Sequence, residues 1–191
     1  MKKRQIGVIG SAGPEEYPYE QPEKDMFMAA EEIGELLARN ECIVVNGGKG
    51  GVMEAVCRGA KREGGITVAE VAGLGRGESN DYVDIEMVTT DVGFRGPSAL
   101  VGMCDAIISI GGGAGTLQEI AVAYRMGLPI ILVTGYGGWT DKLTGEFLDE
   151  RRTVRFDRTD SINEAVSLAL GYASDRLKRL TLPITDKDDR I

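Results

Sequence analysis

The chain repeats one unit: a short apolar run, a turn that is often rich in glycine, and a segment with the apolar spacing of a helix. Short apolar runs bounded by turn residues are typical of strands buried on both faces, and strands that alternate with helices form parallel sheets. The pattern therefore predicts an α/β fold in which helices cover both faces of a mainly parallel sheet. The predicted strands are Ile6–Ile9, Cys42–Val45, Ile66–Val71, Ile85–Val88, Ala106–Ile110 and Ile130–Val133.

Helices are predicted between these strands from apolar residues three and four positions apart. The clearest spans residues 23–39, and Asn40 is suited to end it. Others are predicted over residues 52–63, over 95–103 and from Thr116 to about Met126, and the segments 140–149, 153–156 and 160–177 continue the alternation. Residues 72–84 are polar and interrupted by glycine, which is typical of a mobile loop.

A length of 191 residues suits one domain with one core. We assign residues 1–178 to a single phosphate-binding or nucleotide-binding domain. The charged residues 179–191 are expected to form a frayed tail.

Composition excludes several partners and chemistries. The 22 basic and 30 acidic residues leave a net charge of −8, which disfavours a nucleic-acid polymer as partner. No stretch approaches the roughly 18 apolar residues that span a bilayer, so we expect a cytoplasmic protein without a membrane partner. The sequence has no histidine, and its three cysteines lack the spacing of metal ligands, so no metal site is predicted.

Three glycine turns follow predicted strands, at Gly10–Gly13, Asn46–Gly51 and Gly111–Thr116. At the carboxyl edge of a parallel sheet, such turns lead into helix N-termini whose free amides attract anions. The first turn lacks the dinucleotide fingerprint, because Pro14 follows it instead of a helix. The second is not a P-loop, because no Ser or Thr follows Lys49.

The third turn is the best candidate for a phosphate site. Its four glycines in five positions allow backbone amides to approach an oxyanion, Thr116 adds a hydroxyl, and Glu119 follows one helical turn later. The alternative is that the glycines only connect a strand to a helix, and that Glu119 is a charge favoured by the helix dipole. The residues predicted to bind ligand are Gly10, Ser11, Gly13, Asn46, Gly47, Gly48, Ser98, Gly111, Gly112, Gly113, Gly115 and Thr116.

The segment Ile110–Glu119 resembles the PGGxGTxxE motif of the LONELY GUY family, also called lysine-decarboxylase-like, and Gly93–Arg95 lies where that family carries an arginine motif. Asn46–Gly48, Gly50–Val56 and Gly137–Asp141 resemble a branch that includes the molybdenum-cofactor carrier proteins. The resemblance implies a Rossmann-like three-layer fold, a homo-oligomer (dimer or tetramer) and a nucleoside 5′-monophosphate as ligand.

Two functions follow from the resemblance as hypotheses. Enzymes of the family hydrolyse the N-glycosidic bond to give the base and ribose 5-phosphate, and their catalytic pair corresponds to Arg95 and Glu119. The alternative is a carrier or binding protein for a phosphorylated pterin (the molybdenum cofactor) or a nucleotide. Gly96 stands where active enzymes have a basic residue, which favours binding over hydrolysis. Neither function requires a cofactor beyond the ligand.

Two residues have a structural alternative. Arg95 could form a salt bridge instead of contacting a ligand, and Trp139 could either stack on a base or cover the sheet.

Overall fold

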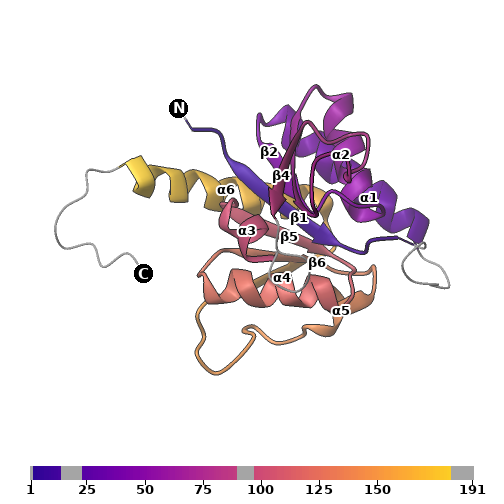
Figure 1. Ribbon diagram of the computed structural model, residues 1–191. Helices are drawn as coiled ribbons and strands as arrows, with labels where there is room; N and C mark the ends of the chain where they lie inside the picture. The colour runs from indigo at the N-terminus through magenta and orange to yellow at the C-terminus, as the bar shows by residue number, and fades with distance from the viewer. Residues whose placement is uncertain (1, 14–22, 90–96, 182–191) are drawn as a thin grey trace.

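Seven parallel strands form one sheet in the part of the chain that the computed structural model describes, residues 2–13, 23–89 and 97–181 (Figure 1). The strand order is β4-β3-β2-β1-β5-β6-β7, and every neighbouring pair is parallel. The strands are β1 (Gln5–Gly10), β2 (Ile43–Asn46), β3 (Ile66–Ala72), β4 (Ile85–Thr89), β5 (Ala106–Ile110), β6 (Ile130–Val133) and β7 (Phe156–Thr159).

Helices cover both faces of the sheet (Figure 1). On one face, α1 (Glu23–Arg39), α2 (Val52–Arg62) and α6 (Ile162–Thr181) share a core with β1, β2, β5 and β6. On the other, α3 (Pro97–Gly102) and α4 (Ala114–Arg125) pack on a second core. The short α5 (Gly138–Lys142) follows β6. The predicted Rossmann-like three-layer fold is confirmed.

The sequence misplaced several element boundaries in the second half of the chain. Residues 153–156 were predicted to continue the strand pattern, but β7 begins at Phe156, because pairing with Ile130 of β6 buries that ring. The predicted element over residues 140–149 is reduced to α5, and residues 143–155 form no helix or strand. Helix α6 extends to Thr181, three residues into the segment predicted as a frayed tail.

Two glycines bring α1 and α2 unusually close together. A Cβ atom on Gly34 of α1 would overlap the backbone of Val56, and one on Gly59 of α2 would overlap the carbonyl oxygen of Glu31. Any larger side chain at either position would push α1 and α2 apart and disturb their packing on this face of the sheet.

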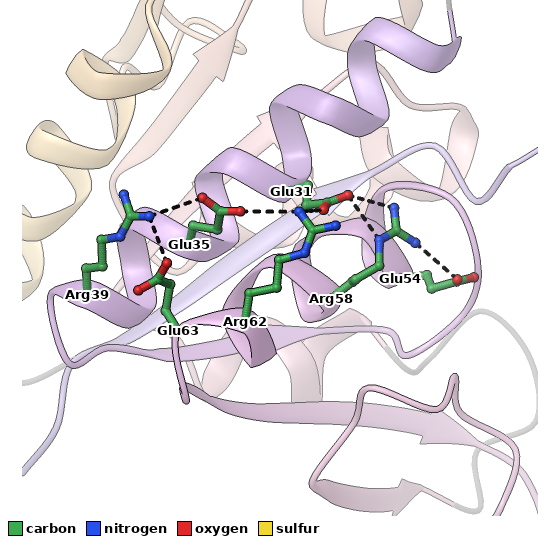
Figure 2. A network of polar contacts seen from close by, with 7 residues as sticks. All are labelled: Glu31, Glu35, Arg39, Glu54, Arg58, Arg62 and Glu63. Carbon is green, nitrogen blue, oxygen red and sulfur yellow. Dashed lines mark hydrogen bonds and ion pairs between the residues drawn. The ribbon is translucent and has the colours of Figure 1, made fainter.

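A network of seven charged side chains lies over this helix contact (Figure 2). Glu31 is the centre of the network: it accepts hydrogen bonds from Arg58 at 2.8 and 3.0 Å and also pairs with Arg62. Arg39 pairs with Glu63 at 2.7 Å. Glu31 is only 13% exposed, whereas the arginines are more open to solvent. The ion pairs of Glu31 therefore contribute more to stability than the more exposed pair of Arg39 with Glu63.

Candidate functional site

A cleft lies at the carboxyl edge of the sheet, where β1 and β5 are neighbours. The chain passes from β1 to β2 on one side of this point and from β5 to β6 on the other, so the strand order reverses here. Such a point is the usual ligand position in parallel sheets. The cleft volume is about 160 Å³, below the roughly 300 Å³ of a site that encloses a drug-sized ligand. It suits a phosphate and the atoms next to it. Its lining residues are Val8, Ile9, Gly10, Ser11, Ala12, Gly47, Met53, Gly113, Ala114, Gly115, Thr116 and Glu119.

The N-terminus of α4 opens onto this cleft. Gly113 is the N-cap, with φ −99° and ψ −153°, and no side chain caps the helix. The amides of Ala114, Gly115 and Thr116 have no partner within the helix, because they belong to its first turn. Together with the helix dipole, these amides create a local positive potential that suits an anion.

None of the residues that the structure describes requires a glycine at position 115. A Cβ atom there would meet nothing within 4 Å, and the residue lies in the first turn of a regular helix. Alanine would stabilise such a position by up to about 1 kcal/mol relative to glycine. A ligand held against the backbone would account for the missing side chain.

Two hydroxyls line the cleft with different hydrogen-bonding capacities. Ser11 Oγ accepts the Gly112 amide at 2.9 Å, which leaves the Ser11 hydrogen available for a ligand. Thr116 Oγ1 donates to the Gly10 carbonyl at 3.1 Å, which leaves only its lone pairs. Ser11 is therefore the better donor to a phosphate oxygen.

The second glycine turn contributes one lining residue, Gly47. Asn46 is fully buried beneath it, where its side chain accepts the Gly48 amide at 2.8 Å and donates to the Cys57 sulfur at 3.0 Å. Gly48 has φ +70°. Asn46 thus shapes the turn from below instead of lining the cleft.

The segment 72–84 packs on the same turn. Asn80 donates through its side chain to the carbonyls of Gly48 at 3.1 Å and Lys49 at 2.9 Å. Glu86 of β4 in turn accepts bonds from the amide and hydroxyl of Ser79. The segment has no helix or strand of its own between residues 73 and 84, but these bonds connect it to the site.

The first glycine turn packs directly on the start of α2. A Cβ atom on Gly13 would lie 3.2 Å from the Gly51 amide nitrogen, and Gly13 has φ +99°. The Val52 amide donates to the Ser11 carbonyl at 2.9 Å. Gly13 is therefore needed for contact between the two turns and does not line the cleft.

Glu119 is a half-buried carboxyl on the cleft side of α4. Burial, and to a smaller extent the charge of Glu70, raises the pKa of Glu119 to about 8. Glu70 is buried in β3 on the same face of the sheet as Val68, and it accepts a bond from Thr89. Roughly a tenth of Glu119 is ionised at pH 7 in the described arrangement.

The remaining predicted residues lie in other places. Arg95 falls outside the described residues, and Ser98 lies in α3, where its side chain is not described. Gly111 and Gly112 do not line the cleft, but their φ values of +64° and +91° make the turn into Gly113. Glu70 was not predicted, although an acidic residue inside the apolar run Ile66–Val71 was a signal for it.

Comparison with known proteins establishes the family. A model of the SLOG cluster4 family matches residues 3–166. The chain belongs to the SLOG cluster4 family. An uncharacterized protein of Archaeoglobus fulgidus shares 42% identity over 127 residues, which are 66% of this chain and 78% of that protein.

Solved structures agree with this placement of the SLOG cluster4 chain. The protein TM1055 is 33% identical, with a TM-score of 0.79 over 88% of this chain and 99% of its own. The molybdenum cofactor binding protein of the phototrophic bacterium Rippkaea orientalis is 29% identical, with a TM-score of 0.74 over 90% of this chain and 98% of its own. These matches confirm the relationship to the LONELY GUY group predicted from Ile110–Glu119.

A search for membrane-spanning segments covered the residues that the structure describes. None of the helices found there has both the length and the apolar character needed to cross a bilayer.

Proposed function

We propose that this SLOG cluster4 protein binds a small phosphorylated ligand in the cleft between β1 and β5 and holds it without cleavage at neutral pH. The observation that carries the proposal is Gly115: no described residue gives a reason for a glycine there, whereas a phosphate against the first turn of α4 does. The uncapped amides of that turn supply the charge complement.

The phosphate has a defined set of donors in this proposal. The amides of Ala114 and Gly115 approach it from the helix, and the Ser11 hydroxyl approaches from the end of β1. Gly113 and Gly47 leave space on either side, and Met53 provides an apolar contact. A nucleotide or a phosphorylated pterin would extend from the cleft with its ring system outside the 160 Å³ that is described.

The molybdenum cofactor is one ligand that fits this chemistry as cargo, since the similar Rippkaea orientalis protein binds it. Among the described residues, no group of three or more His, Cys, Asp or Glu side chains could hold a metal ion. We therefore infer that such a cargo would be held chiefly through its phosphate and its ring system.

A second candidate function is the hydrolysis of a nucleoside 5′-monophosphate. An ionised carboxylate beside the ribose would stabilise the positive charge that develops when the N-glycosidic bond breaks. Because the pKa of Glu119 is about 8, the described arrangement favours the protonated form at pH 7. This activity would therefore increase as the pH rises through 8, with Arg95 as the predicted partner.

Binding is tested with adenosine 5′-monophosphate, adenosine and inorganic phosphate by calorimetry, and by mass spectrometry of ligand that copurifies with the protein. Gly115→Ala is expected to weaken binding of the monophosphate at least about tenfold while leaving the melting temperature unchanged or higher. Gly171→Ala, at an exposed position of α6, should leave binding unchanged. If Gly115→Ala binds as tightly as the parent protein, the proposed phosphate position is wrong.

Turnover is tested separately by measuring the release of free base from adenosine 5′-monophosphate between pH 6 and pH 9. The binding proposal predicts no release at pH 7. Release that increases with pH and disappears in Glu119→Gln, while binding persists, would instead establish the hydrolase.

We also infer that the protein is a homo-oligomer, a dimer or a tetramer, from the motifs it shares with the LONELY GUY group. Ile66 of β3 and Ile85 of β4 lie on the α3–α4 face of the sheet and are 37% and 52% exposed, so they supply apolar surface for such a contact. Light scattering combined with size-exclusion chromatography measures the oligomer number, and a monomer at micromolar concentration would contradict the inference.

A further inference from the structure

The segment Gly137–Asp141, which overlaps the first four residues of α5, forms four hydrogen bonds with β5 or with the glycine loop, defined here as Gly111–Gly115. The backbone amide of Trp139 donates to the Gly112 carbonyl at 2.8 Å. The backbone amide and the hydroxyl of Thr140 both donate to the Gly111 carbonyl, at 3.1 and 2.7 Å. Ser109 Oγ lies 2.7 Å from Thr140 Oγ1.

These bonds determine which way two peptide groups of the glycine loop point. In a trans peptide the N–H and C=O bonds point in opposite directions. Because the Gly111 carbonyl faces Thr140, the amide of Gly112 must point away from α5, and it does so, toward Ser11 Oγ. By the same reasoning, the Gly112 carbonyl faces Trp139, so the amide of Gly113 points away from α5, and Gly113 lines the cleft.

The Thr140 hydroxyl is the one side-chain contact among these bonds to the glycine loop. It is fully buried, and its single hydrogen is given to the Gly111 carbonyl, so Ser109 must donate to Thr140. Gly138 allows the close approach, because a Cβ atom there would overlap the Gly111 and Gly112 backbone. Thr140 and Gly111 are 29 residues apart in the sequence, so local turn preferences would not produce this contact.

We propose that Thr140 is a positioning residue for ligand binding: its buried hydroxyl holds the Gly111 carbonyl away from the cleft, so that the Gly112 amide reaches Ser11 Oγ and the Ser11 hydrogen is presented to the ligand. Its effect on affinity rests on the proposed function, whereas its effect on the loop does not. Thr140 acts through the glycine loop and is not one of the residues that line the cleft.

The loop geometry is tested first in the ligand-free protein. Thr140→Val keeps the shape of the side chain but removes the donor, so amide hydrogen exchange at Gly112 is expected to become at least about tenfold faster. Thr140→Ser keeps the hydroxyl and should retain slow exchange. Thr159→Val removes another buried hydroxyl, which bonds to Glu164 in a different part of the fold, and should leave Gly112 unchanged. Unchanged exchange in Thr140→Val would overturn the positioning role whether or not any ligand binds.

Affinity for adenosine 5′-monophosphate is then measured on the same proteins. Thr140→Val should bind about tenfold more weakly, whereas Thr140→Ser and Thr159→Val should stay within about twofold of the parent protein. Equal loss in Thr159→Val would assign the effect to general destabilisation and overturn the proposal. If the parent protein binds no phosphorylated probe, the proposed function fails, and the exchange experiment still decides the role of Thr140.

Discussion

Replacing Glu119 by Gln should stabilise the folded protein at neutral pH, although it removes a residue of the candidate site. The unfolded chain releases the Glu119 proton near its ordinary pKa of 4.5, whereas the folded chain keeps it until about pH 8. Between these values the unfolded state is favoured as the pH rises, so the parent protein loses stability. Gln resembles the protonated carboxyl group and does not titrate, so the variant avoids this loss.

The size of the effect follows from the shift. From pH 4.5 to pH 7 the parent protein loses about 3 kcal/mol, since each pH unit contributes about 1.4 kcal/mol, and the loss approaches about 5 kcal/mol above pH 8. For a protein of this length, about 3 kcal/mol corresponds to roughly 6 to 12 °C in melting temperature. Below pH 4.5 both states are protonated, and the two proteins should be nearly equal.

Urea denaturation of both proteins between pH 4 and pH 9 measures the difference directly. Glu86 provides a control of opposite sign, because the Ser79 hydroxyl and the Gly77 amide lower its pKa. Glu86→Gln should be less stable than the parent protein at pH 7, and this difference should shrink as the pH falls below about 4.5, the ordinary pKa of the group. If the difference in unfolding free energy between Glu119→Gln and the parent protein does not change between pH 4.5 and pH 8, the explanation of the Glu119 shift is refuted.

Three further predictions concern the site and the helices around it. Glu70→Gln should lower the pKa of the cleft glutamate, measured by NMR titration, because it removes a repelling charge; a raised pKa would contradict this. Gly138→Ala should cost more than about 2 kcal/mol in urea denaturation, because the new methyl group overlaps backbone atoms, whereas Gly137→Ala, also at positive φ but in open space, should cost about 1 kcal/mol. Gly59→Ala should lower the melting temperature by separating α1 from α2, whereas Gly171→Ala should raise it slightly; equal shifts would contradict the close helix contact.

Much of the fold could be predicted because its signals are local. The strands Ala106–Ile110 and Ile130–Val133 were predicted to the residue, since each is a continuous apolar run between turn residues. Helix α1 likewise matches its predicted range 23–39. In contrast, β7 is an edge strand with a mixed sequence, so its position depends on which residue pairs with β6.

The candidate site was predictable to the same extent. Gly113, Gly115, Thr116 and Glu119 line the cleft as the glycine spacing indicated, because a helix that starts after a strand brings its first two turns to one place. Asn46 was also predicted as a ligand contact, but the structure places its amide below the turn. Side-chain direction at a strand end depends on the helix packed beneath it, which the sequence alone does not specify.

The sequence by itself determined the order of the elements and the glycine turns at the carboxyl edge, because backbone preference and apolar period act over a few residues. Only the tertiary structure decided which groups face one another there. Glu70 raises the pKa of Glu119 across 49 positions of chain, and Thr140 orients Gly111 across 29, because packing brings these segments together. The glycine loop supplies the amides, and its neighbours in space determine where those amides point.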